Sequence, residues 1–427
     1  MTRCEKPEPR PPAPGRAADF VVEEVLRESP GSTGDYAIYQ ATKRWLTTPQ
    51  LQQRLAQQLG AAPRALSFPA LKDRAALTTQ HFSLRGAGIG QISGPNFRAR
   101  LVGRLPRPLA PRDLLGNRFT VTLRSLNPQA AAAMGARLAE LGREGLPNYF
   151  DQQRFGSYSP GGAFIGKAIL QGNAEAALRA YLAQPVPGDT PALRAFKAFA
   201  NDHWRDWDAL FQEAPRSNQR SLLTFLRDHP EDFRKALNLI TPRLLPLLLA
   251  AYQSFLWNRM VSRLLQRRLA GSPAQTWPVE AVNPRVEVAG EPLALYRGIP
   301  QDLAEELRGL AVPLPHHRAV FPSAEVEDAA RRVLEEEGLT LDDLKARLLK
   351  RAYLPRSLCP VAVFPGETAS ETLTATPDNG VNIRLRFFLP PGSYGTLVLK
   401  ALTAGTGDTQ AWCQGLEQDT PGEGPED

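Results

Sequence analysis

Cysteine, histidine and methionine are scarce in this chain of 427 residues, which contains three, five and three of them. Cys4, Cys359 and Cys413 are too few and too scattered for a disulfide framework or a zinc site. None of the histidines follows the His-Glu-x-x-His spacing of a metalloprotease helix. The sequence therefore favours chemistry that needs no bound metal.

Phosphate-binding loops and nucleophile elbows are also missing. No Gly-rich loop is followed by Lys-Ser or Lys-Thr, and no G-x-S-x-G motif is present. The glycine-rich stretch Gly86–Gly94 lies outside any strand-to-helix context, so we interpret it as a turn. We expect no cofactor, and any catalysis would use side chains alone.

Long apolar runs are absent as well. The most apolar run, Leu244–Trp257, contains Pro246 and becomes polar at Gln253, which makes it too short for a membrane span. Residues 1–16 are rich in Pro and Arg, lack the apolar core of a secretory signal, and are expected to be disordered. We expect a cytoplasmic protein with no membrane partner.

Positive charge is what the chain has in excess. The net charge is +7, yet residues 405–427 hold six acidic and no basic residues, so the body up to Ala404 carries +13. We expect this acidic tail to be disordered. Arginine outnumbers lysine, which suits bidentate contacts to phosphate. Such a body indicates a polyanionic partner, although many soluble proteins are simply basic.

The pattern of short β-runs and helical periodicity divides the chain. Residues 17–173 are strand-rich, residues 174–353 are dominated by helical periodicity, and β-character returns in residues 354–404. The late β-runs are Asn379–Pro390 and Tyr394–Leu402. This order predicts an α+β protein in which one domain is interrupted by another.

One helix is marked at both ends. Thr47 or Thr48 is predicted to cap it, Pro49 fits its first turn, and Gly60 ends it.

A charged triplet, Lys72-Asp73-Arg74, interrupts the otherwise apolar stretch Phe68–Leu84. Flanking cations favour the ionised form of a carboxylate, which suits a nucleophile or an electrostatic anchor. The competing interpretation is a charged turn between two strands.

Two further stretches point to nucleic acid. The region after the triplet contains several arginines, of which Arg98, Arg100 and Arg104 are candidates for phosphate contacts, although a solvated sheet face is the alternative. The segment Leu146–Gly156 combines aromatic, amide and Arg side chains, which can stack a base and bind its edge. Core packing explains its aromatic residues easily but explains its amide and Arg residues badly.

Five stretches together resemble the TruD family of tRNA pseudouridine synthases. They occur in the family's order between Asp19 and Leu402. In chain order they read DFVVEE, LKDRAALTTQ, GNRFTVTLR, PNYFDQQRFG and FFLPPGSYGTLVLKAL. The resemblance implies a discontinuous catalytic domain with a mainly antiparallel sheet, covering residues 17–173 and 354–404. It also implies that residues 174–353 form a helix-rich insertion, the TRUD domain.

The resemblance further implies a function and a site. The expected reaction is isomerisation of uridine, at position 13 in the D arm of tRNA, to pseudouridine, with tRNA as partner and with no metal or cofactor. Asp73 would be the catalytic aspartate, and the contacts to the target nucleotide would come from Phe20, Lys43, Asn148, Phe150 and Tyr394. We expect a monomer.

Alternatives remain at this stage. Attack of Asp73 on the anomeric carbon of the ribose and proton abstraction through a glycal are both open. A rival function is RNA binding without catalysis, and an unrelated hydrolase is a third.

Overall fold

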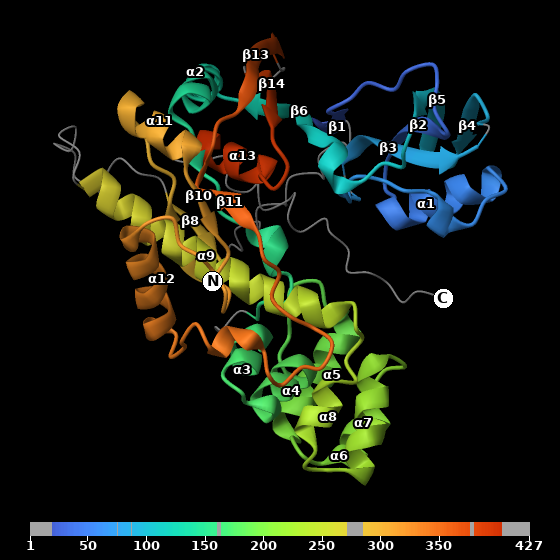
Figure 1. Cartoon of the computed structure of the whole chain (residues 1–427), viewed down its shortest axis with the longest axis vertical. Coiled ribbons are helices and arrows are strands. Elements are labelled where there is room, and N and C mark those ends of the chain that lie inside the picture. Colours follow the sequence, from blue (N-terminus) through green and yellow to red (C-terminus); the bar gives the residue numbers. More distant parts are fainter. Residues whose placement is uncertain are drawn as a thin grey trace, which may run out of the picture. The chain divides into compact units, whose positions relative to one another are not determined.

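A computed structural model describes residues 19–74, 76–86, 88–159, 164–270, 285–375 and 380–403 (Figure 1). The segments expected to be disordered, 1–16 and 405–427, lie outside these residues. The described residues form two compact units, of which unit 1 comprises 19–143 and 364–403, and unit 2 comprises 144–363. The domain boundaries expected from the sequence stay predictions.

Unit 1 is built on an eight-stranded sheet in the order β13-β14-β6-β1-β3-β2-β5-β4. Neighbouring strands are antiparallel except for β1 and β3, which run parallel. The strands are β1 (Phe20–Leu26), β2 (Tyr36–Lys43), β3 (Leu77–Arg85), β4 (Gln91–Gly94), β5 (Phe97–Leu105), β6 (Leu114–Leu126), β13 (Gly366–Ala375) and β14 (Val381–Leu389). The expected α+β class with a mainly antiparallel sheet is confirmed.

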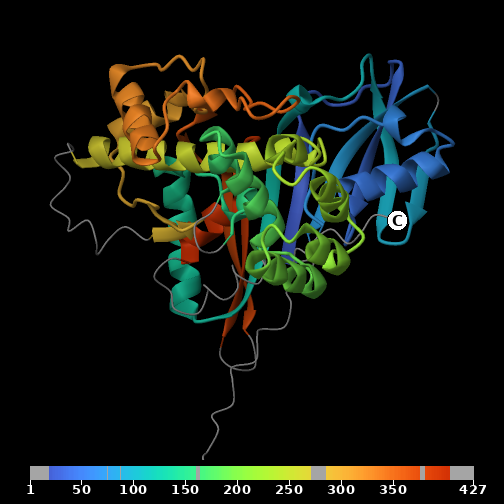
Figure 2. The same cartoon turned by 90° about the horizontal axis from the view of Figure 1, so that it is seen from below.

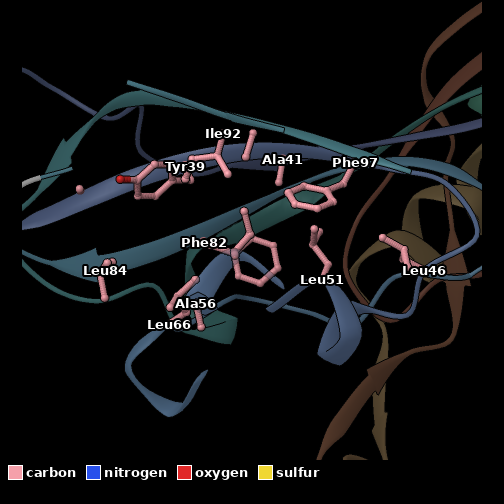
Figure 3. Close-up of a cluster of buried hydrophobic side chains, with 13 residues drawn as sticks. Tyr39, Ala41, Leu46, Leu51, Ala56, Leu66, Phe82, Leu84, Ile92 and Phe97 are labelled. Carbon is pink, nitrogen blue, oxygen red and sulfur yellow. The ribbon is translucent and has the colours of Figure 1, made fainter. Parts of the chain in front are cut away.

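The helices of unit 1 flank this sheet. They are α1 (Thr48–Gln58), α2 (Pro128–Glu144), α13 (Gly395–Thr403) and the short 3-10 turns Pro63–Ala65 and Pro111–Asp113. Leu51 and Leu55 of α1 pack on Tyr39, Phe82 and Phe97 of the strands and form a closed apolar core (Figure 3).

Helix α1 begins and ends as its sequence predicts. Thr47 is the N-cap and forms a capping box with Gln50, while Pro49 lies in the first turn. The chain leaves the helix through Gly60, whose φ of +64° lies in the left-handed region that glycine tolerates.

Two expectations about local structure are wrong. The run Tyr394–Leu402 was expected to be β, but Gly395–Thr403 forms helix α13. Nearly every residue of α13 is buried, so its apolar run has no periodicity that separates a buried helix from a strand. Within the expected turn Gly86–Gly94, Gln91–Gly94 pairs with β5 as strand β4.

Unit 2 is mostly helical. Its helices are α3 (Ile165–Leu170), α4 (Ala174–Ala183), α5 (Pro191–Asp202), α6 (Trp207–Glu213), α7 (Asn218–Asp228), α8 (Phe233–Leu237), α9 (Leu244–Ala270), α11 (Gln301–Gly309) and α12 (Ala324–Glu336), with 3-10 turns at Gln152–Phe155 and Asp343–Lys345. Its strands are β7 (Leu146–Pro147), β8 (Arg285–Val288), β9 (Glu291–Ala294), β10 (Ala311–Pro313), β11 (Leu358–Pro360) and β12 (Ala362–Val363).

The long helix α9 is the scaffold of unit 2, because α3 and α12 both pack along it (Figure 2). Strand pairs β10–β11, β7–β12 and β8–β9 complete the unit as small two-stranded sheets. Among the described residues, no helix is both long and apolar enough to cross a membrane.

Candidate active site

One row of side chains crosses five strands of the unit 1 sheet. The register pairs Lys43 with Thr78, Thr78 with Val22, Val22 with Phe119, and Phe119 with Phe387. Directly paired residues point to the same face of a sheet, so these side chains share one face. Lys43 and Thr78 are fully buried on it.

Three of the expected site residues gather at one end of this sheet. Strands β1 and β3 are parallel with Val21 opposite Leu77, so Phe20 and the loop that precedes Leu77 lie at the same end. Asp73 belongs to that loop. Strand β2 is antiparallel to β3 and ends there, at Lys43.

The loop that contains Asp73 is held through its main chain. The N–H of Lys72 donates to the Thr48 hydroxyl at 2.9 Å, and the buried Lys43 amine donates to the carbonyl oxygen of Asp73 at 2.5 Å. The Asp73 residue itself is exposed. Its backbone is therefore fixed by neighbouring elements while the residue remains exposed.

Arg74, the next residue of the loop, is bonded to Trp45, whose backbone conformation is strained. The N–H of Trp45 donates to the carbonyl oxygen of Arg74 at 3.0 Å. The φ of Trp45 is +57°, in the left-handed region that is unfavourable for a bulky residue.

Lys72, one of the two cations beside Asp73, has a buried carboxylate as its partner. The Lys72 amine lies 3.0 Å from a carboxylate oxygen of Glu24, and both side chains are buried. Glu24 also accepts from the main-chain N–H of His81 at 2.8 Å and lies 3.1 Å from its Nδ1. Lys72 thus anchors the loop to β1 and β3, and its charge is met by Glu24.

Lys43 is the most unusual ionisable group of the site. Its burial lowers the pKa of the amine to about 8, a shift that the negative charge of Asp73 opposes and the positive charge of Lys72 increases. A buried cation that is held this way indicates a group retained for position rather than for stability.

The residue that follows Tyr394 packs against Phe119 on the same face. Tyr394 directly precedes α13, whose Gly395 lies so near the Phe119 ring that a Cβ there would be 2.8 Å from Cε1. The Phe119 ring also contacts Phe20 edge-on, with ring centroids 6.0 Å apart. Unit 1 therefore places Phe20, Lys43 and Asp73 at one end of its sheet, and Tyr394 directly precedes the helix that packs on Phe119.

Asn148 lies in unit 2 and has one unused polar atom. Its main-chain N–H donates to the carbonyl of Val361 at 2.9 Å, and its Nδ2 donates to the carbonyl of Pro360 at 3.2 Å. The side-chain oxygen Oδ1 is buried and has no hydrogen-bond partner in the described part of the chain. A buried acceptor in this state is suited to a donor from a ligand.

Phe150, also in unit 2, is fixed by α9. Asn258 accepts from the N–H of Phe150 and donates to its carbonyl oxygen, both at 2.8 Å. The Phe150 ring meets Trp257 edge-on at 5.4 Å, and the Arg154 guanidinium lies 5.5 Å from its centroid. Arg154 in turn donates to the Ser254 hydroxyl at 3.0 Å.

The arginines expected to bind phosphate differ in their surroundings. Arg98 and Arg100 alternate with buried residues on β5 and are exposed, although Arg100 donates twice to Gln40. Arg104 donates to the carbonyl oxygens of Gly34 and Gly86. Arg104 thus supports turns, while Arg98 keeps the accessible position expected of a phosphate contact.

Sequence reasoning missed the α9 residues that support Phe150. Ser254 and Asn258 are polar residues within a long apolar helix, and both are buried. Polar side chains inside such a run are the signal that could have found them, because a buried polar group needs a partner. No group of three or more metal-ligating side chains occurs among the residues described.

Comparisons with known proteins identify the family of this chain. A family profile described as tRNA pseudouridine synthase D (TruD) matches residues 15–402. A probable tRNA pseudouridine synthase D of Halobacterium salinarum is 31% identical over 90% of this chain and 91% of its own length. A probable tRNA pseudouridine synthase D 2 of Methanocaldococcus jannaschii is 29% identical over 90% and 89%.

A solved structure is similar over the same length. The crystal structure of a putative tRNA pseudouridine synthase D from Methanosarcina mazei superimposes with a TM-score of 0.67 at 25% identity, covering 91% of this chain and 92% of the other. These matches define an isomerase that acts on tRNA. The chain belongs to the tRNA pseudouridine synthase D (TruD) family, which confirms the resemblance seen in the sequence.

The buried Lys43 predicts a pH effect on stability. Its pKa is about 8 when folded and 10.5 when unfolded, so between these values the unfolded chain binds a proton that the folded chain has lost. The free energy of unfolding of the wild type, relative to Lys43→Met, should therefore rise by up to about 3 kcal/mol from about pH 8 to pH 10.5. Urea denaturation of both proteins measures it, with the exposed Lys350→Met as charge control. If the difference in unfolding free energy between the wild type and Lys43→Met does not change with pH, burial does not lower the pKa of Lys43.

The two hydrogen bonds between Asn258 and the main chain of Phe150 predict coupled losses of stability and turnover. Asn258→Leu keeps the volume but leaves two main-chain groups of Phe150 without partners, at about 1–3 kcal/mol each. We expect kcat for pseudouridine formation to fall together with the melting temperature. Asn238→Leu is the matched control, since Asn238 similarly bonds the main chain of Leu348 and Lys350. If both variants lose stability and keep the same kcat, the hydrogen bonds of Asn258 do not position Phe150 for catalysis.

Proposed function

We propose that this enzyme converts uridine-13 in the D arm of tRNA to pseudouridine, with Asp73 as the catalytic aspartate. The N-glycosidic bond breaks, the uracil rotates, and a bond forms between the anomeric carbon and a ring carbon. The released uracil is both leaving group and incoming nucleophile. Its ring carbon loses a proton when the new bond forms and its freed ring nitrogen gains one, so the atoms balance without a cofactor. Asp73 either attacks the anomeric carbon or abstracts the proton of the neighbouring ribose carbon.

The observation that carries this proposal is the exposed aspartate on a fixed loop. The main chain on either side of the Asp73 carboxylate is bonded to Lys43 and Thr48. A nucleophile held in one place loses little entropy when it meets the ribose. In this proposal Lys43 positions the loop of Asp73 through its bond to the main chain. Any contact between Lys43 and the nucleotide would be of lesser importance.

Aromatic and amide side chains are proposed to hold the flipped uridine. Phe20 contacts Phe119, Tyr394 directly precedes Gly395, which packs on the Phe119 ring, and Phe150 offers a ring fixed by α9. The unpartnered Oδ1 of Asn148 suits the N3–H donor on the edge of uracil. Stacking and phosphate contacts would offset the few kcal/mol that flipping a base requires.

Removing the charge of Asp73 tests the chemistry. Asp73→Asn keeps the size of the side chain, so pseudouridine formation should fall by about a thousandfold or more while tRNA affinity stays nearly unchanged. Carbodiimide-dependent reverse-transcription stops on a tRNA transcript measure the product. Asp228→Asn, at an exposed carboxylate that ends α7, is the control and should keep full activity.

The same experiment separates the rival function. An RNA-binding protein without catalysis would form no pseudouridine as the wild type and would bind tRNA equally well as Asp73→Asn. Full activity of Asp73→Asn would overturn the assignment of the catalytic residue.

Asn148 and the position of the target are tested together. Asn148→Ala removes the buried acceptor, so turnover should fall about tenfold to a hundredfold, as expected when a hydrogen bond to substrate is lost. Mapping all pseudouridines in total RNA, with and without the protein, identifies the target. If the uridine-13 signal persists while others vanish, the position is wrong and the chemistry stands.

The cytoplasmic location and the monomeric state expected from the sequence stay predictions. A tRNA substrate is consistent with the first.

A further inference from the structure

An exposed basic and apolar surface lies on unit 2, outside the residues discussed so far. It consists of Tyr353, Arg356 and Leu358 on one segment and Arg318 on the facing segment, and we call it the basic strip. Tyr353 and Leu358 are 75% and 66% exposed, unusually high for large apolar side chains. Arg318 and Arg356 are exposed as well.

The two segments of the basic strip are adjacent in space. Strands β10 and β11 pair with Pro313 opposite Leu358, and the N–H of Leu314 donates to the carbonyl of Ser357 at 2.9 Å. Just beyond this pairing, Gln253 of α9 donates to the carbonyl oxygens of Pro315 and Pro355, at 2.8 and 3.0 Å. Because Gln253 is fully buried, it fixes the spacing of the two segments before any partner binds.

The positive charges of the basic strip have no carboxylate partner within the part of the chain that the structure describes. Arg318 and Arg356 form no ion pair with any described residue. Both lie near His316: burial lowers the pKa of that imidazole, and the positive charges of Arg356 and Arg318 lower it further. Two like charges kept together without an acid are unfavourable in the free protein and favour an anionic partner.

The arginines of α9 and α12 in unit 2 show the opposite arrangement. Between α9 and α12 and along α12, arginines are matched to carboxylates, in the pairs Arg259–Glu337, Arg263–Glu336, Arg267–Asp328, Arg268–Glu325, Arg331–Glu327 and Arg332–Asp328. These pairs join or cover helices. The unpaired cations of the basic strip are therefore not explained by the packing of unit 2.

The basic strip leads directly to Asn148. Strand β11 continues from Leu358 to Pro360, whose carbonyl oxygen accepts from Asn148 Nδ2 at 3.2 Å. The next carbonyl, of Val361, accepts from the Asn148 N–H. A nucleic acid held by Asn148 would thus extend over a continuous segment of chain toward the basic strip.

We propose that the basic strip binds the tRNA next to the target uridine. Arg318 and Arg356 contact backbone phosphates, and Tyr353 and Leu358 cover an adjacent base or ribose, as aromatic and apolar side chains do in single-stranded segments. The inference rests on the proposed function, since it takes Asn148 as a contact to the target nucleotide.

Salt-dependent binding of a tRNA transcript tests the inference. The double variant Arg318→Ala/Arg356→Ala should raise the Kd by about tenfold to a hundredfold and reduce the slope of log K against log salt by about 1.4–1.8, the value for two lost phosphate contacts. Fluorescence anisotropy of labelled tRNA at several salt concentrations measures both. The control, Arg331→Ala/Arg332→Ala, removes two exposed arginines that are paired with acids, and it should change neither.

A second pair of variants isolates the aromatic contact. Tyr353→Ala should weaken binding by about fivefold to a hundredfold, and Tyr353→Phe should restore it if the ring stacks. Pseudouridine formation by the wild type is measured in parallel, so that failure of the proposed function is seen separately. If the wild type is active and the basic strip variants bind tRNA with unchanged Kd and slope, the inference is overturned and the strip belongs to a protein partner.

Discussion

Irregular segments carry four of the candidate site residues, namely Asp73, Asn148, Phe150 and Tyr394. Each irregular segment needs partners for its main-chain groups. In unit 1 the buried Lys43 and Thr48 supply them to the loop of Asp73. In unit 2 the buried Asn258 does the same for Phe150. Unpaired main-chain groups are costly when buried, so these few side chains decide where the chain can be irregular. The site geometry depends on them.

The residues that position the loop of Asp73 do so at a cost in stability. Burial disfavours the charged amine of Lys43, and Trp45 adopts a left-handed backbone conformation that is unfavourable for its bulky side chain. Both residues bond the loop of Asp73. Strain and buried charge that gather on one loop are typical of a functional site, because a loop selected for stability alone would lose them.

Much of the fold was predictable, and most of the site's support was not. Helix α1 could be predicted from Thr47, Pro49 and Gly60, because caps act locally. The pairing of Lys72 with Glu24 could not, since it depends on the parallel register of β1 and β3. Helix α13 was mistaken for a strand because it is buried all round. Asn258 gave a readable signal, a polar residue in an apolar helix, but its partner Phe150 lies far away in the sequence.

The charge of the chain illustrates the same limit. A net charge of +7 suggests a polyanionic partner without saying where it binds. In unit 2 the structure shows both kinds of arginine: those of α9 and α12 are matched to carboxylates, and Arg318 and Arg356 beside His316 are not. An arginine without a carboxylate can offer its charge directly to a phosphate, since a paired arginine must first give up its carboxylate. An interface for RNA is therefore better located by unmatched arginines than by the number of arginines.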